Sequence, residues 1–239
     1  MAKAVRIKSP NQRAREQARV ERESRERRKR MMLFAGAAAA VAVVALIVVG
    51  AISRGDNFVN VRPDVNRDGK TLGDPTAPVT LQAWEDFQCP YCKQANQDAL
   101  SQVIRDFVQS GQVKVVYRHF AFLGDESSLA AQASEAAAEQ GMFWEYHDAL
   151  FAAQAGENRG AFSSSRLKQM ASNVGLDRAV FDAALDSGKY KSVVEAETSE
   201  GRKLGLDSTP VFFVNGVKIE GAQPYSVFKS TIEGALAAP

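Results

Sequence analysis

The chain of 239 residues is long enough for a tail plus one domain, or for two small domains. Its net charge of +2 is unevenly distributed, because residues 1–30 hold 12 Lys or Arg and 4 Glu, a net charge of +8. Of the totals of 30 basic and 28 acidic residues, 18 basic and 24 acidic residues remain for positions 31–239, a net charge of −6. The positive overall charge comes from the tail and therefore does not indicate nucleic-acid binding.

Residues 31–52 form a stretch of 22 residues without a charged side chain. As a helix, this stretch would be about 33 Å long, which is enough to cross the roughly 30 Å hydrocarbon core of a bilayer. Positions 27–30 are all basic, whereas only Arg54 closely follows the apolar stretch. This asymmetry predicts a transmembrane signal anchor with its N-terminus in the cytoplasm and the rest of the chain outside it.

Three alternatives to an uncleaved anchor fit the sequence less well. A cleavable signal peptide usually has a shorter basic region and a shorter apolar run. A twin-arginine signal would need apolar residues where Lys29 and Arg30 stand, and a soluble buried helix would be shorter than this run. We therefore expect a single-pass protein of the cell membrane, in contact with the lipid bilayer, with a basic cytoplasmic tail at 1–30 and a C-terminal part in the periplasm or at the cell exterior.

Residues 53–77 are rich in Gly, Asp, Asn and Pro, and this composition predicts an extracytoplasmic stalk. Within it, the run DVNRDG, from Asp64 through Asp68 to Gly69, matches the first half of a calcium-binding loop. Such a loop requires Glu at its twelfth position, where this chain has Pro75. Without that bidentate carboxylate, a polar turn is favoured over a calcium site.

From residue 78 the sequence shows a regular succession of elements. Residues 78–84 alternate between apolar and polar side chains, which predicts a strand. A helical stretch begins at Pro90 and continues to about Ser110, where Gly111 ends it. Residues 113–120 predict a second strand.

A long helical block follows the second strand, at about residues 127–206, with Ser164 and Asp177 as expected helix caps. The dipeptide Asn215-Gly216 between two β-rich runs predicts a hairpin, and residues 224–238 predict a final helix. This order predicts an α/β domain at 78–239, in which a sheet layer carries an inserted helical subdomain.

Cys89 and Cys92 are the only cysteines of the chain. A structural zinc site needs four ligands, usually in two close pairs, and His119 and His147 are too far apart in the sequence to form the second pair. We therefore expect no metal. A disulfide between Cys89 and Cys92 would close a very short loop and so stabilise the fold little, which makes a purely structural role a poor explanation.

Redox chemistry fits the position of the pair. The cysteines lie where a strand gives way to a helix, and Pro90, which lacks an N–H group, suits the first helical turn. Free backbone N–H groups and the helix dipole stabilise a thiolate there and lower the pKa of Cys89. Cys92, one turn later, is placed to resolve a mixed disulfide, while Pro90 and Tyr91 between the cysteines tune the reduction potential. Disulfides also form outside the cytoplasm, where the predicted topology places this pair.

Two motifs in this order resemble a known family. The stretch APVTLQAWEDFQCPYC, residues 77–92, and the distant STPVFFVNG, residues 208–216, look like the DsbA family of thiol-disulfide oxidoreductases, in particular its membrane-anchored members. The similarity spans roughly residues 70–237. It implies a thioredoxin fold with an inserted helical subdomain, preceded here by one transmembrane helix, and it implies no cofactor.

The resemblance also implies roles for individual residues. Cys89 would be the exposed nucleophile and Cys92 the buried resolving thiol. Pro210 would be a cis-proline that faces the pair. Thr209 before it would leave its backbone available to pair with an extended substrate chain as an added strand.

One position departs from the family pattern. Such domains often carry a buried acidic residue six positions before the first cysteine, where it relays a proton to the second thiol, and this chain has Ala83 there. Glu85 and Asp86 are nearby, but we expect their side chains to point to solvent. Water or Glu85 is then the expected proton relay.

The sequence thus predicts an extracytoplasmic thiol-disulfide oxidoreductase that oxidises dithiols in exported unfolded or cysteine-containing proteins. A membrane redox partner, most simply a quinone-linked oxidase, would reoxidise it. Two alternatives stay open: a disulfide reductase or isomerase supplied by a membrane electron donor, and a tethered binding or chaperone module on a thioredoxin scaffold.

Overall fold

The structure is a computed structural model that describes residues 65–238. The predicted tail at 1–30, the predicted anchor at 31–52 and the first part of the predicted stalk lie outside the described residues. Within residues 65–238, no helix combines the length and the apolar character that crossing a bilayer would require.

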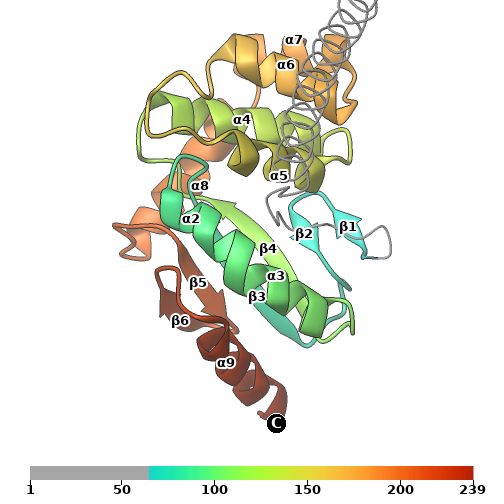
Figure 1. The fold of residues 1–239 in the computed structure, drawn as a ribbon, viewed down its shortest axis with the longest axis vertical. Coiled ribbons are helices and arrows are strands. Elements are labelled where there is room, and N and C mark those ends of the chain that lie inside the picture. The colour runs from blue at the N-terminus through green and yellow to red at the C-terminus, as the bar shows by residue number, and fades with distance from the viewer. Residues whose placement is uncertain (1–64, 239) are drawn as a thin grey trace, which may run out of the picture. The chain divides into compact units, whose positions relative to one another are not determined.

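A mixed sheet lies at the centre of the described region (Figure 1) and contains six strands in the order β1-β2-β4-β3-β5-β6. The central strands β3 (Val79–Glu85) and β4 (Val113–His119) are parallel, as expected for strands joined by a helix. Strand β5 (Val211–Val214) runs antiparallel to β3, and β6 (Val217–Glu220) runs antiparallel to β5. The predicted strands at 78–84 and 113–120 are therefore confirmed within one residue.

The sheet begins earlier in the chain than the sequence predicted. A short hairpin of β1 (Arg67–Asp68) and β2 (Thr71–Leu72) pairs through β2 with β4. Leu72 is completely buried in the main core. The prediction of a stalk at 53–77 is therefore wrong for residues 65–77. The sequence does not indicate these strands, because two-residue strands are too short to show an alternating pattern. Gly69, with φ of +52°, forms the hairpin turn within the calcium-like run.

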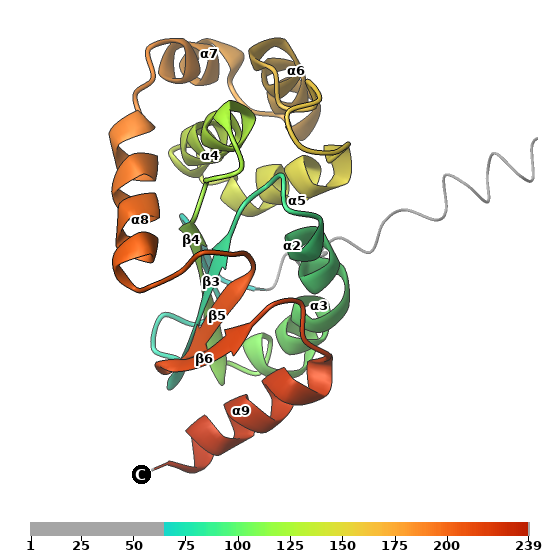
Figure 2. The same cartoon turned by 90° about the vertical axis from the view of Figure 1, so that its left-hand side faces the viewer.

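The helix that follows β3 runs without interruption from Pro90 to Val108, close to the predicted range. Together with α9 (Tyr225–Ala237) it packs on one side of the sheet, whereas α8 (Lys191–Lys203) packs on the other side (Figure 2). Two of its turns are π-helical, a feature that often occurs near functional sites. Its parts are α2 (Pro90–Ala95), a π-helical segment (Asn96–Leu100), α3 (Ser101–Val103) and a second π-helical segment (Ile104–Val108).

The helical insertion joins β4 to β5, at the predicted place in the chain. Four of its helices gather at one end of the sheet, α9 lies at the opposite end, and α8 returns the chain to the sheet (Figures 1 and 2). This arrangement is a thioredoxin fold with an inserted helical subdomain. The gathered helices are α4 (Asp125–Ala138), α5 (Phe143–Ala153), α6 (Ser164–Val174) and α7 (Arg178–Asp186).

Local signals at three positions had different outcomes. The carboxylate of Asp177 accepts hydrogen bonds from the backbone N–H groups of Ala179 and Val180, so this predicted cap of α7 is confirmed. Ser164 is the first residue of α6 rather than its cap, and Ser163 occupies the cap position without a capping hydrogen bond from its side chain. The Asn215-Gly216 turn between β5 and β6 has positive φ at both residues, as a tight two-residue hairpin requires.

The two faces of the sheet bury different clusters. Side chains at alternate positions of β3, such as Leu81 and Ala83, enter the main core beneath the cysteine-bearing helix. Trp84 points the other way and packs with Phe120 in a smaller cluster. Gly201 of α8 lies directly over this cluster, where an added Cβ would be 2.7 Å from Phe120 Cδ2 and 3.3 Å from Trp84 Cε3.

We expect Gly201→Ala to lower the free energy of unfolding by about 1–3 kcal/mol, because overpacking forces the rings or α8 to move. Urea denaturation of the purified protein would measure this change. Gly234→Ala is the matched control, since Gly234 lies in α9 with open space around it. There the gain in helix propensity predicts up to about 1 kcal/mol of added stability. Equal effects at both glycines would contradict the close contact at Gly201.

Candidate active site

Cys89 and Cys92 lie at the start of α2, where β3 has just ended. Cys89 is the residue before the first helical turn, and Pro90 occupies that turn as predicted. Both thiols are free, so the structure represents the dithiol form. Cys92 is completely buried, whereas Tyr91 is 62 % exposed beside the pair.

Cys89 is less accessible than the resemblance implies. Only 5 % of its surface is exposed. Its thiol donates a hydrogen bond of 3.3 Å to the backbone carbonyl of Thr209, from the loop that covers it. The peptide bond between Thr209 and Pro210 is cis. The predicted cis-proline loop therefore does face the cysteines, although it also shields the nucleophile.

The surroundings of Cys89 favour its thiolate. The hydrogen bond from the Cys92 thiol makes the largest contribution to a pKa lowered to about 7, and the side chain of Thr209 and the backbone N–H groups of Cys92 and Tyr91 lower it further. Burial acts in the opposite direction but does not prevail. The free N–H groups at the helix start thus act as the sequence predicted.

Cys92 has the opposite character. Burial is the main reason that its pKa is raised well above its ordinary value, and the hydrogen bond with Cys89 and the nearby charge of Glu85 raise it further. The pair is therefore asymmetric. One thiol ionises readily near neutral pH, and the other holds its proton until the chemistry removes it.

The loop before the cysteines is fastened by groups that the sequence did not reveal. The Asp86 carboxylate accepts hydrogen bonds from the backbone of Gln88, the hydroxyl of Ser127 and the backbone N–H groups of Phe122 and Leu123. The Gln154 side chain, just beyond α5, donates hydrogen bonds of 2.8 and 3.0 Å to the carbonyls of Phe87 and Cys89. The helical insertion thus holds the active-site loop in place.

Glu85 and Asp86 do not point to solvent as predicted, since each is only 1 % exposed. The Asn96 amide donates hydrogen bonds of 2.9 and 3.1 Å to the two carboxylate oxygens of Glu85, and one of 2.9 Å to the carbonyl of Cys92. Glu85 is buried because α5 covers this end of β3, where His147 of α5 lies 4.0 Å from the carboxylate. No local sequence pattern at Glu85 predicts that a distant helix packs there. A carboxylate is therefore present near Cys92 even though Ala83 is not acidic.

Comparison with known proteins agrees with this geometry. The family model described as Thioredoxin matches residues 66–234, well over half of the chain. Disulfide bond formation protein D of Bacillus subtilis is 30 % identical over 186 residues, which covers 77 % of this chain and 83 % of that protein. The chain belongs to the DsbA-like thiol-disulfide oxidoreductases.

Two solved structures place this oxidoreductase among its relatives. The crystal structure of oxidised BdbD from Bacillus subtilis matches with a TM-score of 0.67 and 30 % identity, over 72 % of this chain and 94 % of that one. The crystal structure of α-DsbA1 from Wolbachia pipientis matches with a TM-score of 0.63 and 21 % identity, over 73 % of this chain and 92 % of that one, and it supports the fold alone. The CxxC pair at Cys89 and Cys92 is the redox-active centre of the oxidoreductase.

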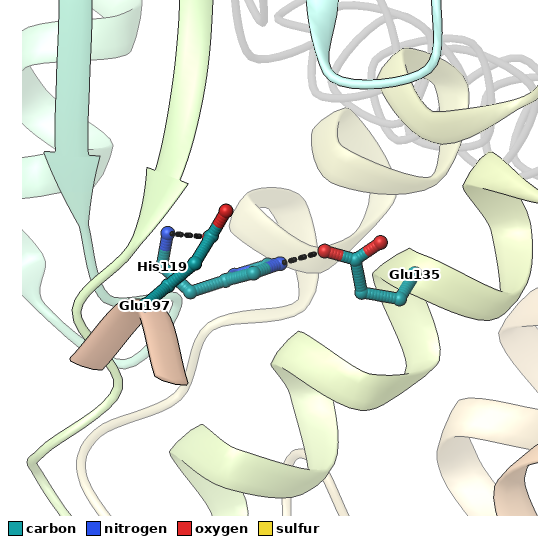
Figure 3. A group of neighbouring side chains, drawn as sticks. All are labelled: His119, Glu135 and Glu197. Carbon is teal, nitrogen blue, oxygen red and sulfur yellow. Dashed lines mark hydrogen bonds and ion pairs between the residues drawn. The ribbon is translucent and has the colours of Figure 1, made fainter. Parts of the chain in front are cut away.

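A second group of titratable side chains brings together β4, α4 and α8 (Figure 3). His119 of β4 hydrogen-bonds through Nε2 to Glu135 of α4 at 3.0 Å, and its backbone N–H donates to Glu197 of α8. The three residues are spaced as metal ligands would be. However, the ammonium group of Lys70 lies 2.6 Å from Glu135 and 2.7 Å from Glu197. The cation of this cluster is therefore lysine, contributed by the β1-β2 hairpin.

We expect Cys89 to react with iodoacetamide at a half-maximal rate near pH 7, since its pKa is lowered to about 7. Quantifying the modified peptide by mass spectrometry across pH would measure this midpoint, and buried Cys92 should stay unmodified. Cys92→Ala should move the midpoint upward, because it removes the hydrogen bond that contributes most. A midpoint near 9 in the unaltered protein would contradict the described environment.

Replacing Lys70 by Gln should lower the free energy of unfolding by about 2–4 kcal/mol, because two largely buried carboxylates lose the cation they share, and only Glu197 keeps another one nearby, Arg118 at 3.6 Å. Burial raises the pKa of Glu135, but the hydrogen bond and charge of His119, and then the charge and hydrogen bond of Lys70, lower it to about 2. The stabilisation that Lys70 gives through Glu135 is therefore present above the ordinary pKa of 4.5 and is lost as the pH falls toward 2. The difference between variant and parent should therefore shrink over that pH range in chemical denaturation.

Lys191→Gln is the control for this experiment, because Lys191 forms an exposed pair with Glu195 and should change stability by less than about 0.5 kcal/mol. A chelator should leave the melting temperature of the parent protein unchanged. A large loss of stability with EDTA would show that a metal ion occupies the cluster in place of lysine.

Proposed function

We propose that this oxidoreductase oxidises dithiols in exported proteins. A client thiolate attacks Sγ of Cys89, so that a client–Cys89 disulfide forms and the Cys89–Cys92 bond breaks. Cys92 leaves as a thiolate and takes up a proton. A second client thiolate then attacks the client sulfur, so that a disulfide forms within the client and Cys89 is released. Over the two steps the client gives two electrons to the enzyme. Thr209 and Pro210 would hold the extended client segment beside Cys89.

The observation that supports this direction is the lowered pKa of Cys89. A stabilised thiolate favours the dithiol form, and it therefore makes the disulfide a stronger oxidant. A shift from 9.0 to about 7 corresponds to about 60 mV at alkaline pH, but only to about 10 mV near pH 7, where half of the thiol is ionised. Near pH 7 this shift therefore makes the Cys89–Cys92 disulfide only a slightly stronger oxidant than the same pair with an unshifted Cys89.

The proposed location is the outer side of the cell membrane. It is supported by the basic tail at 1–30 and the uncharged stretch at 31–52, which are typical of a signal anchor. A membrane partner linked to quinones would take the two electrons from Cys89 and Cys92 and restore the disulfide.

A second candidate is a reductase or isomerase that a membrane electron donor keeps reduced. It is favoured by the same pKa, because a value near 7 is that of the reducing thioredoxin, whereas the strongly oxidising DsbA has a value of about 3.5. The two functions differ in the reduction potential of the Cys89–Cys92 pair, which makes this potential the decisive measurement.

Equilibration of the purified chain with glutathione buffers should give a potential between about −230 and −120 mV. Cys89→Ser should abolish oxidation of a reduced, unfolded client protein. Cys92→Ser is the matched control, since it keeps the nucleophile and should accumulate a mixed disulfide with the client. A potential near −270 mV, or full oxidase activity in Cys89→Ser, would contradict the proposal.

A further inference from the structure

Glu85 takes the place of the missing acidic residue on the same face of the sheet. Side chains two positions apart on a strand point to the same side, so Glu85 faces the cysteine-bearing helix just as Ala83 does. Asn96 links the Glu85 carboxylate to the helical turn that carries Cys92. A carboxylate is therefore present two residues further along β3 than Ala83, and its charge acts on the buried thiol of Cys92.

His147 of α5 lies next to this carboxylate. Its Nε2 is 4.0 Å from Oε2 of Glu85, and its Nδ1 is 2.9 Å from Oδ1 of Asp148. An approach of about 1 Å would bring Nε2 within hydrogen-bond distance of Glu85. The side chains of Glu85 and His147 are each 1 % exposed, whereas that of Asp148 is 19 % exposed. The three residues therefore lead from the buried Glu85 carboxylate toward solvent.

The surroundings of His147 are mostly aromatic. Nε2 of His147 and the hydroxyl of Tyr117 are buried and lack a hydrogen-bond partner among residues 65–238. Such unsatisfied groups are rare in native proteins and need an explanation. Beyond Glu85, Tyr117 and His119 are the titratable groups on β4 near the ring, and the charges of Glu145 and Arg67 act on Asp148. The rings around His147 are Phe87, Tyr117, Phe143, Trp144 and Phe151.

A structural role alone does not explain an ionisable ring in this pocket. Burial by itself lowers the pKa of His147, but the hydrogen bond to Asp148 and the proximity of Glu85 outweigh burial and raise the pKa. An apolar ring would fill the same space without the cost of burying a charge. The imidazole is instead placed between two carboxylates, where its two nitrogens can accept and release a proton at opposite sides.

We propose that Glu85, His147 and Asp148 form a proton path between Cys92 and solvent. When a mixed disulfide on Cys89 is resolved, Cys92 loses its proton and attacks Sγ of Cys89. The Cys89–Cys92 bond forms, and the bond to the departing thiolate breaks. The proton passes to Glu85, then through His147 to Asp148 and to water. The reverse route supplies a proton when the Cys89–Cys92 bond is opened.

Under this proposal, Glu85 acts on the reacting thiol, and His147 and Asp148 are positioning residues that act through Glu85. The path requires only disulfide exchange between Cys89 and Cys92, in either direction. It therefore does not depend on whether the enzyme is an oxidase or a reductase in the cell.

The test separates the two steps of oxidation by oxidised glutathione in the full-length chain. In the first step Cys89 forms a mixed disulfide, and in the second step Cys92 displaces glutathione. Glu85→Gln and His147→Gln should slow the second step by about tenfold or more and move its pH dependence upward, while the first step stays within about twofold. Rapid acid quenching followed by mass spectrometry would measure both steps.

His119→Gln is the matched control, because His119 is equally buried and its ring also packs against Tyr117, but it binds Glu135 instead of Glu85. It should leave both rates and the pH profile unchanged. Asp148→Asn changes the partly exposed end of the path and should give the same upward pH shift. It replaces His147→Gln in the test if that variant does not fold. A normal second step in Glu85→Gln or in His147→Gln would overturn the path, as would an equal slowing in His119→Gln.

Discussion

The geometry of the active site depends on the carboxylate of Asp86. It lies three residues before Cys89 and accepts hydrogen bonds from its own loop and from the first residues of the helical insertion. Burial raises the pKa of this carboxyl group, and four hydrogen-bond donors act against that increase. A buried carboxylate with full hydrogen bonding is rigid, because each partner that moves leaves a costly unsatisfied charge. Asp86 therefore fixes where the strand ends and where the cysteine-bearing helix begins.

The helical insertion is part of the catalytic environment as well as of the fold. Ser127 and Gln154 hold the loop, and His147 lies beside Glu85. The thioredoxin core alone contributes the two thiols, the cis-proline loop and the helix N-terminus that stabilises the thiolate. The insertion adds polar side chains that hold the loop before the cysteines and that lie beside Glu85.

The sequence predicted the core elements well because their signals are local. Alternation along 78–84, the turn residues Asn215-Gly216 and the position of Pro90 each reflect a constraint within a few neighbouring residues. The burial of Glu85 was not predictable in this way, because it depends on α5, a distant segment that closes over the end of β3. The β1-β2 hairpin was missed for a related reason, since its pairing with β4 holds it in place and its own sequence resembles a polar turn.

The cluster around Lys70 has a consequence for the order in which the chain acquires its structure. Lys70 and Glu197 are 127 positions apart, and contacts of such long range form late because a large loop must close first. During synthesis the β1-β2 hairpin emerges before its carboxylate partners exist. The hairpin therefore reaches its full charge compensation only after the chain has been made as far as Glu197, so a fragment that ends before α8 would leave Lys70 without one of its two carboxylates.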